Sequence, residues 1–361
     1  MNKFISLVLT VCLSLPLFAQ ARREMVIPNL KGYVTLKCDF HIHTVFSDGL
    51  VWPTVRVDEA YVEGLDAIAI TDHIEFRPFI TGGDIVGSHN RSYEIAKDRA
   101  KDKGIILIKG GEISRGMPPG HHNAIFLTNV DELDKPEYMD AFRAAKAQNA
   151  FIMWNHPGWI RQAPDSTVWW PEHTVLYEQG LMQGIEVAQY GIYYPEAHRW
   201  ALEKNLTMIG NSDTHESIQE ESEYGHWSHR PMTLIFAKER TSESIHEALK
   251  ERRTAVYFEE NIIGREKHLK ELFENAVEWK VERKDNTATI MFKNKSDLTF
   301  YMKNTQRDSG LGYSKKWTVE PHSTYAIVVN LRSDNYHGNV IFSVENFLVE
   351  PDKGMKYTIK I

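Results

Sequence analysis

The feature that most constrains the fold is an alternation of short apolar runs with helical stretches between residues 33 and 265. Glycine at the expected C-terminal ends of helices, and Pro, Ser or Thr at their expected N-terminal ends, mark the helix boundaries. The alternation predicts a parallel sheet with crossover helices, and seven or eight such units favour a barrel over an open sheet. The expected strands are Tyr33–Phe40, Ala67–Thr71, Ile105–Ile108, Ala124–Leu127, Phe151–Trp154, Gly184–Val187, Leu206–Ile209 and Met232–Phe236. The expected helices are Thr54–Val62, Ser92–Lys103, Glu137–Gln148, Pro195–Lys204 and Ser242–Arg252.

From about residue 273 the pattern changes to short alternating strands separated by turn-forming residues. The sequence therefore predicts an α/β domain over residues 22–265, followed by a small, sandwich-like all-β domain over residues 275–361. The charged stretch Glu259–Glu271 is expected to be a solvated helix or a linker. The expected strands are Val277–Val281, Thr287–Phe292, Thr299–Lys303, Ser323–Asn330, Asn339–Val344 and Met355–Ile361.

Residues 1–21 have the pattern of a secretory signal peptide. Lys3 precedes an apolar run over residues 4–18, and Ala19-Gln20-Ala21 supplies the small residues of a cleavage site. The apolar run is too short to span a membrane, and no later stretch is long enough. We therefore expect an exported protein, periplasmic or secreted, whose one remaining cysteine, Cys38, can form no intramolecular disulfide.

Charge and motif content exclude some classes of ligand. With 42 Lys and Arg against 49 Asp and Glu, the formal net charge is −7, so no chain-wide basic surface for duplex nucleic acid is expected. The sequence has neither a Gly-x-Gly-x-x-Gly motif nor a Walker loop, which argues against a nucleotide cofactor. Its composition does not fix the oligomeric state.

Metal-capable side chains stand at nearly every expected strand end of the α/β domain. They are Asp39-Phe40-His41-Ile42-His43, Thr71-Asp72-His73, Gly110-Gly111-Glu112, Gly120-His121-His122-Asn123, Trp154-Asn155-His156-Pro157 and Asn211-Ser212-Asp213-Thr214-His215. Side chains at i and i+2 of a strand point the same way, so His41 and His43 share a side, as do Asp213 and His215. The carboxyl ends of parallel strands in a barrel converge on one rim. Imidazoles and carboxylates gathered there suit Zn²⁺, Mn²⁺ or Fe.

Together these motifs resemble those of the polymerase-and-histidinol-phosphatase (PHP) family of metal-dependent phosphoesterases, in a secreted, phosphodiesterase-like form. The motifs Asp39–Thr44, Ser47-Asp48-Gly49, Ile70–His73, Gly111-Glu112, Gly120-His121, Asn155–Pro157 and Ser212–His215 occur in family order. The resemblance covers about residues 35–240 and leaves out the C-terminal domain. It implies a distorted (β/α)₇ barrel that holds two or three divalent metal ions.

The resemblance also implies which residues bind these ions. His41, His43, Glu112 and Asp213 would hold the first; Glu112 would bridge to a second held by His121 and His156; Asp48, His73 and His215 would hold a third. His121 and His122 face opposite ways in an extended chain, so only one can be a ligand; we favour His121, which follows Gly120, and His122 remains the alternative. Asp72 is expected to support a ligand, and Asp39 to orient His41.

The expected chemistry is hydrolysis of phosphate esters, with phosphodiesters favoured, by a hydroxide that bridges two metals. Glu112, Asp213 and His215 are the expected catalytic residues. The alternatives are a histidinol-phosphatase-like phosphomonoesterase, a metallohydrolase of a non-phosphorus bond, and a non-catalytic metal- or glycan-binding protein. The candidate substrate contacts are Arg115, Arg161 and Arg230, the candidate apolar walls are Trp159, Tyr190 and Trp227, and the candidate general acids are His226 and His229.

Overall fold

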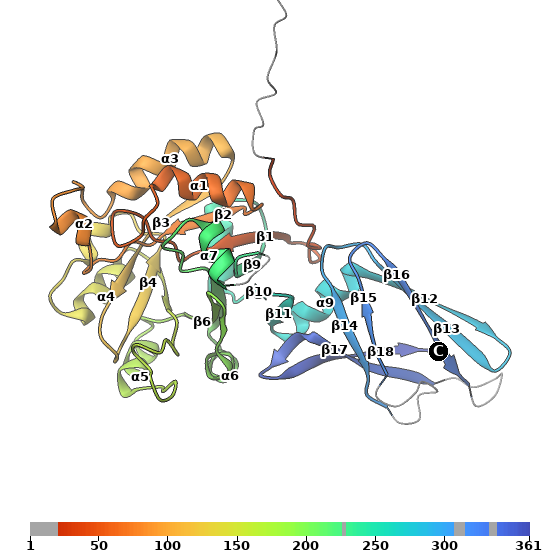
Figure 1. Cartoon of the computed structure of the whole chain (residues 1–361). Coiled ribbons are helices and arrows are strands. Elements are labelled where there is room, and N and C mark those ends of the chain that lie inside the picture. Colours follow the sequence, from red (N-terminus) through yellow and green to blue (C-terminus); the bar gives the residue numbers. More distant parts are fainter. Residues whose placement is uncertain (1–20, 226–228, 307–314, 332–337) are drawn as a thin grey trace, which may run out of the picture.

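The computed structural model describes residues 21–225, 229–306, 315–331 and 338–361. An α/β domain and an all-β domain lie side by side, and helix α9 (Glu266–Ala276) occupies their junction (Figure 1). Residues 1–20 of the expected signal peptide lie outside the described residues, as do His226 and Trp227. Within the described residues, no helix has the length and apolarity needed to cross a membrane.

The α/β domain contains most of the expected elements, some with shifted ends. Its strands are β1 (Val34–Asp39), β2 (Ala67–Ile70), β3 (Ile106–Ser114), β4 (His121–Ile125), β5 (Phe151–Trp154), β6 (Gly184–Gln189), β7 (Ile192–Tyr193), β8 (Thr207–Asn211), β9 (Met232–Ala237), β10 (Thr254–Phe258) and β11 (Asn261–Gly264). Its helices are α1 (Pro53–Val62), α2 (Pro78–Thr81), α3 (Arg91–Lys103), η1 (Val130–Leu133), α4 (Tyr138–Ala147), α5 (Pro171–Glu178), α6 (Pro195–Glu203), α7 (Ile218–Gly225), α8 (Ser242–Lys250) and α9.

The strand order through this domain is β10-β9-β1-β2-β3-β4-β5-β6, and β8 also pairs with β6. Strands β1, β2 and β3 are parallel, and so are β5, β6 and β8, whereas β4 is antiparallel to both β3 and β5, and β9 is antiparallel to β1. Only residues 115–120 join β3 to β4, too few for the crossover that parallel strands require. The α/β class is confirmed, but the expectation of a wholly parallel sheet is wrong, and the seven-unit barrel remains a prediction.

The ends of β1 and β8 meet although they are far apart in the sequence. An isolated parallel bridge pairs Ile42 with Thr214. The backbone N–H of His43 donates to the carbonyl of Thr214 at 3.1 Å, and that of Asp213 donates to the carbonyl of His41 at 2.9 Å. The first and last metal-capable motifs therefore share one edge of the sheet.

The C-terminal domain is all-β, as predicted. Its strands are β12 (Val277–Lys284), β13 (Thr287–Asn294), β14 (Phe300–Asn304), β15 (Lys316–Val319), β16 (Thr324–Asn330), β17 (Asn339–Glu350) and β18 (Lys353–Lys360). One sheet has the order β12-β13-β16, and the other contains β15, β14, β17 and β18. Aromatic rings pack between them: the ring centroids of Phe292 and Phe342 are 5.7 Å apart.

The two domains are joined by strand pairing as well as by helix α9. Strand β11 pairs in parallel with β17, with Ile262 opposite Phe347, so one sheet continues from the α/β domain into the C-terminal domain. One face of α9 is buried through Leu269, Leu272 and Phe273. The expectation of a solvated helix or linker over Glu259–Glu271 therefore holds only in part. Glu266, Lys267 and Lys270 are exposed on a helix, but Ile262 and Ile263 of β11 and Leu269 of α9 are buried in the core at the junction.

Candidate metal centre

The metal-capable side chains from the strand ends converge in space. Their ligand atoms form four overlapping groups, and within each group the atoms lie within 4.8 Å of one another. The groups are His43/Asp48/His73/His215, His41/His156/Asp213, His41/His43/Glu112 and His73/Glu112/His121. All nine residues expected from the sequence to bind metal therefore lie in one cluster.

Glu112, in strand β3, lies at the centre of this cluster and is fully buried. Its Oε1 atom lies 3.3 Å, 3.2 Å and 3.6 Å from ring nitrogens of His41, His121 and His156. Its Oε2 atom lies 3.5 Å from Nε2 of His43 and 2.6 Å from Nδ1 of His73. The two oxygens of one carboxylate thus face two different sets of imidazoles, as a bridging ligand requires.

Asp213 contributes a second central carboxylate. Its Oδ1 atom lies 3.0 Å from Nε2 of both His41 and His43, and its Oδ2 atom accepts a hydrogen bond from Gln189 at 2.9 Å. Its backbone has a φ of 55°, in the left-handed region that non-glycine residues rarely adopt. This turn after β8 directs Asp213 toward His41 and His43, while the next-but-one residue, His215, extends to Asp48.

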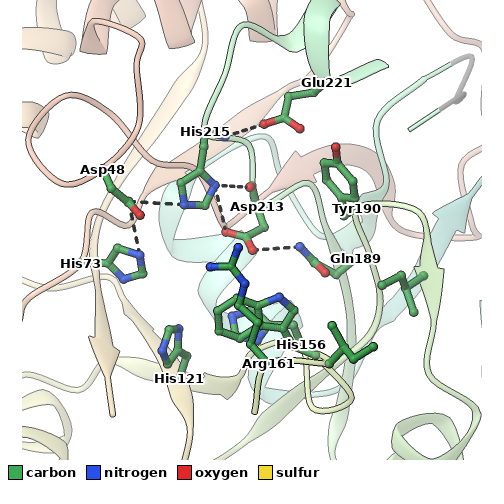
Figure 2. A pocket seen from close by; sticks show the side chains of 13 residues that line it. Asp48, His73, His121, His156, Arg161, Gln189, Tyr190, Asp213, His215 and Glu221 are labelled. Atoms are coloured by element: carbon green, nitrogen blue, oxygen red, sulfur yellow. Dashed lines mark hydrogen bonds and ion pairs between the residues drawn. The ribbon is translucent and has the colours of Figure 1, made fainter. Parts of the chain in front are cut away.

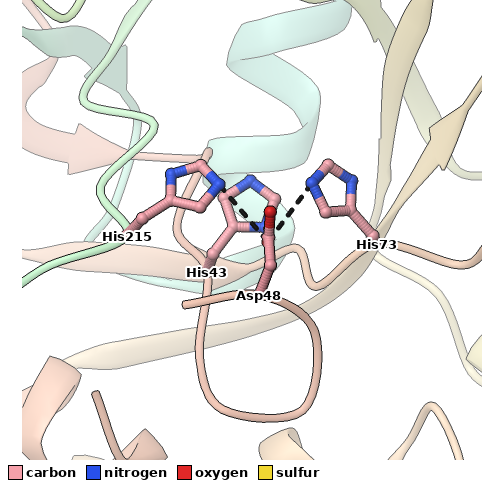
Figure 3. A group of neighbouring side chains, drawn as sticks. All are labelled: His43, Asp48, His73 and His215. Atoms are coloured by element: carbon pink, nitrogen blue, oxygen red, sulfur yellow. Dashed lines mark ion pairs between the residues drawn. The ribbon is translucent and has the colours of Figure 1, made fainter. Parts of the chain in front are cut away.

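Asp48, on the loop after β1, is the carboxylate of the group His43/Asp48/His73/His215 (Figure 3). This group is called the third group because it contains the residues expected to hold the third ion. Its Oδ1 atom lies 3.4 Å from Nε2 of His73 and 3.4 Å from Nε2 of His215. The next residue, Gly49, passes so close to the first motif that a Cβ atom there would lie 2.7 Å from the backbone carbon of His43. Glycine at this position lets the loop return Asp48 to the cluster.

The adjacent histidines His121 and His122 point in opposite directions, as expected at the start of a strand. His121 faces Glu112 and belongs to the cluster. His122 is fully buried on the other side of β4, where its ring lies 4.9 Å from that of Phe142 and 6.3 Å from that of Trp154. Because β4 is antiparallel to its neighbours, its first residues, rather than its last, reach the ends of β3 and β5.

The cluster has the electrostatics of a cation site. Burial alone would raise the pKa of Glu112, but the imidazoles of His73 and His121 hold that pKa well below its usual range. Burial opposes protonation of His41, yet Asp213 and Glu186 raise the pKa of His41 well above its usual value. Among the described residues, five atoms of the cluster are buried without a hydrogen-bonding partner: His41 Nε2, His43 Nε2, Asp48 Oδ1, Glu112 Oε2 and His156 Nδ1. Imidazoles and carboxylates with unmet bonding capacity fit Zn²⁺, Mn²⁺ or Fe.

Glu186 contacts the cluster, although the sequence analysis does not predict it. It is fully buried in β6, where it accepts a hydrogen bond from Nδ1 of His41 at 2.9 Å and another from the backbone N–H of His156 at 2.6 Å. Asp39 was expected to orient the ring of His41, but its carboxylate instead accepts a hydrogen bond from the backbone N–H of His41 at 3.3 Å. The sequence does contain a sign of this role: Glu186 is an acidic residue inside an otherwise apolar strand. A carboxylate buried there needs polar partners.

Asp72 supports the first ligand loop rather than joining a ligand group. Its carboxylate accepts hydrogen bonds from the backbone N–H of Thr44 at 2.7 Å and from the hydroxyl of Ser47 at 3.0 Å. Ser47 in turn lies 3.3 Å from Nδ1 of His43. The motif around His73 therefore fixes the loop that carries His43 and Asp48.

A pocket of about 460 Å³ opens over the cluster (Figure 2). Of the expected substrate contacts and apolar walls, Arg161, Trp159 and Tyr190 line it. Its lining also includes Ile160, Gln189, Ile192 and Glu221, together with Asp48, His73, His121, His156, Asp213 and His215. The pocket therefore joins ligand-type side chains on one side to aromatic and aliphatic side chains on the other.

Two other expected substrate contacts and one expected general acid do not lie at the pocket. Arg115 does not line the pocket; its guanidinium pairs with Glu75 at 2.8 Å. Arg230 is fully buried and pairs with Asp39 at 3.0 Å and with Glu63, so the expectation of a rim cation is wrong. His229 is likewise buried, and its ring is hydrogen-bonded to the backbone carbonyls of Arg230 and Glu63. The expectation that His229 acts as a general acid is therefore wrong.

Comparison with known proteins gives the family. A model of an Ig-like domain matches residues 276–360. A solved two-domain protein from Bacteroides vulgatus, described as containing a predicted PHP-like metal-dependent phosphoesterase, is 53% identical, with a TM-score of 0.91, over 95% of this chain and 100% of its own. The chain therefore belongs to the PHP-like metal-dependent phosphoesterases, in a two-domain form with a C-terminal Ig-like domain.

Two curated relatives match shorter stretches. A 5′-3′ exoribonuclease of Haemophilus influenzae is 38% identical over 81 residues, which is 22% of this chain. An uncharacterised protein of Methanocaldococcus jannaschii is 38% identical over 84 residues, which is 23% of this chain. The matched stretches span 24% and 36% of the length of these two proteins.

Proposed function

We propose that this protein is an exported enzyme that hydrolyses phosphate esters, with phosphodiesters as its preferred substrates and two or three divalent metal ions, Zn, Mn or Fe, as its cofactors. The observation that carries this proposal is the position of Glu112. Its two carboxylate oxygens face separate sets of histidines, so one side chain can serve two ions. Two such ions, when bound, supply Lewis acidity toward phosphoryl oxygens and lower the pKa of a water molecule.

Each proposed ion has its own set of ligand residues. His41, His43 and Asp213 would hold one ion with Glu112, and His121 and His156 would hold the second. Asp48, His73 and His215 would hold a third, and the pKa of the Asp48 carboxyl lies below its usual range: burial opposes this shift, but hydrogen bonds from His215 and His73 outweigh it. Glu186 keeps Nδ1 of His41 engaged, which turns Nε2 toward Glu112 and Asp213.

The charge of the pocket favours a diester over a monoester. A phosphomonoester dianion calls for several dedicated cations, whereas Arg161 is the one Arg or Lys among the described residues that line the pocket. Asp48, Asp213 and Glu221 add carboxylates to the same lining. The local match to a 5′-3′ exoribonuclease is in keeping with a phosphodiester substrate.

The test pairs metal analysis with two substrates that share a leaving group. The full chain is loaded with Zn²⁺, Mn²⁺ or Fe²⁺, its metal content is measured, and its rates on bis(4-nitrophenyl) phosphate and 4-nitrophenyl phosphate are compared. We expect more than one metal per chain and faster turnover of the diester. Faster turnover of the monoester would assign a phosphomonoesterase, and turnover of neither by a metal-loaded protein would refute phosphoester hydrolysis. N-terminal sequencing of the exported protein tests cleavage near Ala21.

A further inference from the structure

Two aliphatic side chains are exposed at the mouth of the pocket. Ile160 is 71% exposed and Ile192 is 43% exposed, and both line the same pocket as the metal-capable residues. They come from different parts of the chain, Ile160 from the segment after β5 and Ile192 from β7. Exposed apolar side chains scattered singly need no explanation, but two beside one polar cluster mark a surface for an apolar ligand group.

Two aromatic side chains continue this surface toward the cluster. The ring of Trp159 lies 5.2 Å from that of His156 and 5.8 Å from that of His121, so the apolar wall begins at the metal-capable residues themselves. Tyr190 lines the pocket with a backbone φ of 57°, in the left-handed region, at the turn between β6 and β7. The polar cluster and the apolar wall are therefore parts of one continuous pocket.

Arg161 places a single positive charge on the apolar side. Its guanidinium carbon lies 5.6 Å from the centre of the Trp159 ring, a cation–π distance that holds the charge beside the wall. One such charge suits one phosphate charge, and the adjoining rings and aliphatic side chains suit an aromatic group attached to that phosphate.

We propose that the pocket mouth, formed by Trp159, Ile160, Tyr190 and Ile192, is a subsite for an aromatic ester group of a phosphodiester monoanion. This inference rests on the proposed function, which places the phosphate at the metal-capable cluster. It adds that the organic group, rather than the phosphate alone, determines which diesters bind. Ile160 and Ile192 are specificity-determining residues in this arrangement, and they take no part in bond cleavage.

Binding of diesters that differ only in their organic groups tests the subsite. Diphenyl phosphate and dimethyl phosphate carry the same single charge, and their dissociation constants are measured by calorimetry with the metal-loaded full chain. We expect diphenyl phosphate to bind at least about tenfold more tightly, because its rings remove apolar surface from water. Equal affinities, or no binding of diphenyl phosphate, would overturn the proposal.

The variant Ile160→Ser/Ile192→Ser identifies the surface responsible. We expect it to weaken diphenyl phosphate binding about tenfold and to leave dimethyl phosphate binding unchanged. Val86→Ser, at a residue that is 86% exposed and outside the pocket lining, is the matched control. Unchanged affinity of the double variant for diphenyl phosphate would refute the subsite. Turnover of bis(4-nitrophenyl) phosphate by the same preparations reports on the proposed hydrolysis separately, so either idea can fail alone.

Discussion

Glu186 accepts a hydrogen bond from Nδ1 of His41 at 2.9 Å, and both side chains are fully buried. This contact leaves Nε2 of His41 facing Glu112 and Asp213. A second carboxylate oxygen of Glu186 accepts from the backbone N–H of His156, so one residue positions two parts of the cluster. A carboxylate behind a histidine fixes its tautomer and raises its basicity as a ligand.

Replacing Glu186 with Gln should weaken metal binding without removing any ligand. We expect the affinity for the tightest-bound ion to fall by about 10- to 100-fold, the usual effect of losing such a supporting carboxylate. Titration with Zn²⁺ against a competing chelator measures the change. Glu178→Gln, at an exposed position on α5, controls for loss of an acid. An affinity equal to that of the native protein would show that Glu186 is only a packing residue.

If Glu112 bridges two ions, its replacement should impair turnover and metal binding more than replacement of Asp48 does. Glu112→Gln removes the charge that faces both sets of imidazoles, so we expect turnover of bis(4-nitrophenyl) phosphate to fall at least about 10²-fold and metal content to drop. Asp48→Asn, in the third group, should have a smaller effect. Both variants are compared at equal folded concentration by circular dichroism, with metals quantified. The assignment fails if Asp48→Asn abolishes turnover while Glu112→Gln retains near-native rate and metal content.

Arg56 of α1 should control the geometry of the third group from outside it. This fully buried guanidinium donates to the carbonyls of His43 at 2.9 Å and His215 at 2.8 Å, which joins the loops that carry these two residues. Arg56→Lys keeps the charge but loses the planar fork, so we expect about one metal fewer per chain and a free energy of unfolding lower by about 2 kcal/mol.

Metal analysis and urea unfolding test this prediction. Arg143→Lys is the matched control, since Arg143 is exposed and pairs with Asp140 on the surface of α4. A full metal complement in Arg56→Lys, with unfolding unchanged, would contradict the role of Arg56.

His268 should make the metal-free protein less stable in mild acid. Burial and the nearby charge of Lys267 lower the pKa of His268 to about 4 from an ordinary value of 6.5. The unfolded chain binds this proton below pH 6.5 and the folded chain does not, so the free energy of unfolding falls between about pH 6.5 and pH 4. We compare the free energy of unfolding in urea at pH 7.0 and at pH 4.5. Its decrease between these pH values should be smaller in His268→Gln than in the native protein, by about 2 kcal/mol. An identical decrease in both proteins would remove His268 from the acid response.

The sequence predicts the ligand residues better than it predicts their supports. His41, His43, Asp213 and His215 could be grouped because strand periodicity and strand-end convergence depend only on local pattern. The direction of β4 was missed because the expected strands left residues 109–123 between them, which is room for a crossover. Strand β3 in fact runs to Ser114 and β4 begins at His121, so the connection is too short for one.

Residues that depend on distant partners were predicted poorly. Glu186 has no neighbour in the sequence that reveals its contact with His41, and it is recognisable only as an acid in an apolar strand. Arg230 was expected at the pocket rim because it precedes β9, yet it is buried against Asp39, nearly two hundred residues earlier. Burial of a charge is decided by such partners, and sequence pattern does not show them.

The pairing of β11 with β17 has a mechanical consequence. Domains connected by a flexible linker rotate independently, but backbone hydrogen bonds across a continuous sheet resist such rotation. The Ig-like domain therefore keeps one fixed bearing toward the pocket of the α/β domain. Any surface or polymer that the C-terminal domain binds will therefore approach the metal-capable cluster from a constant direction.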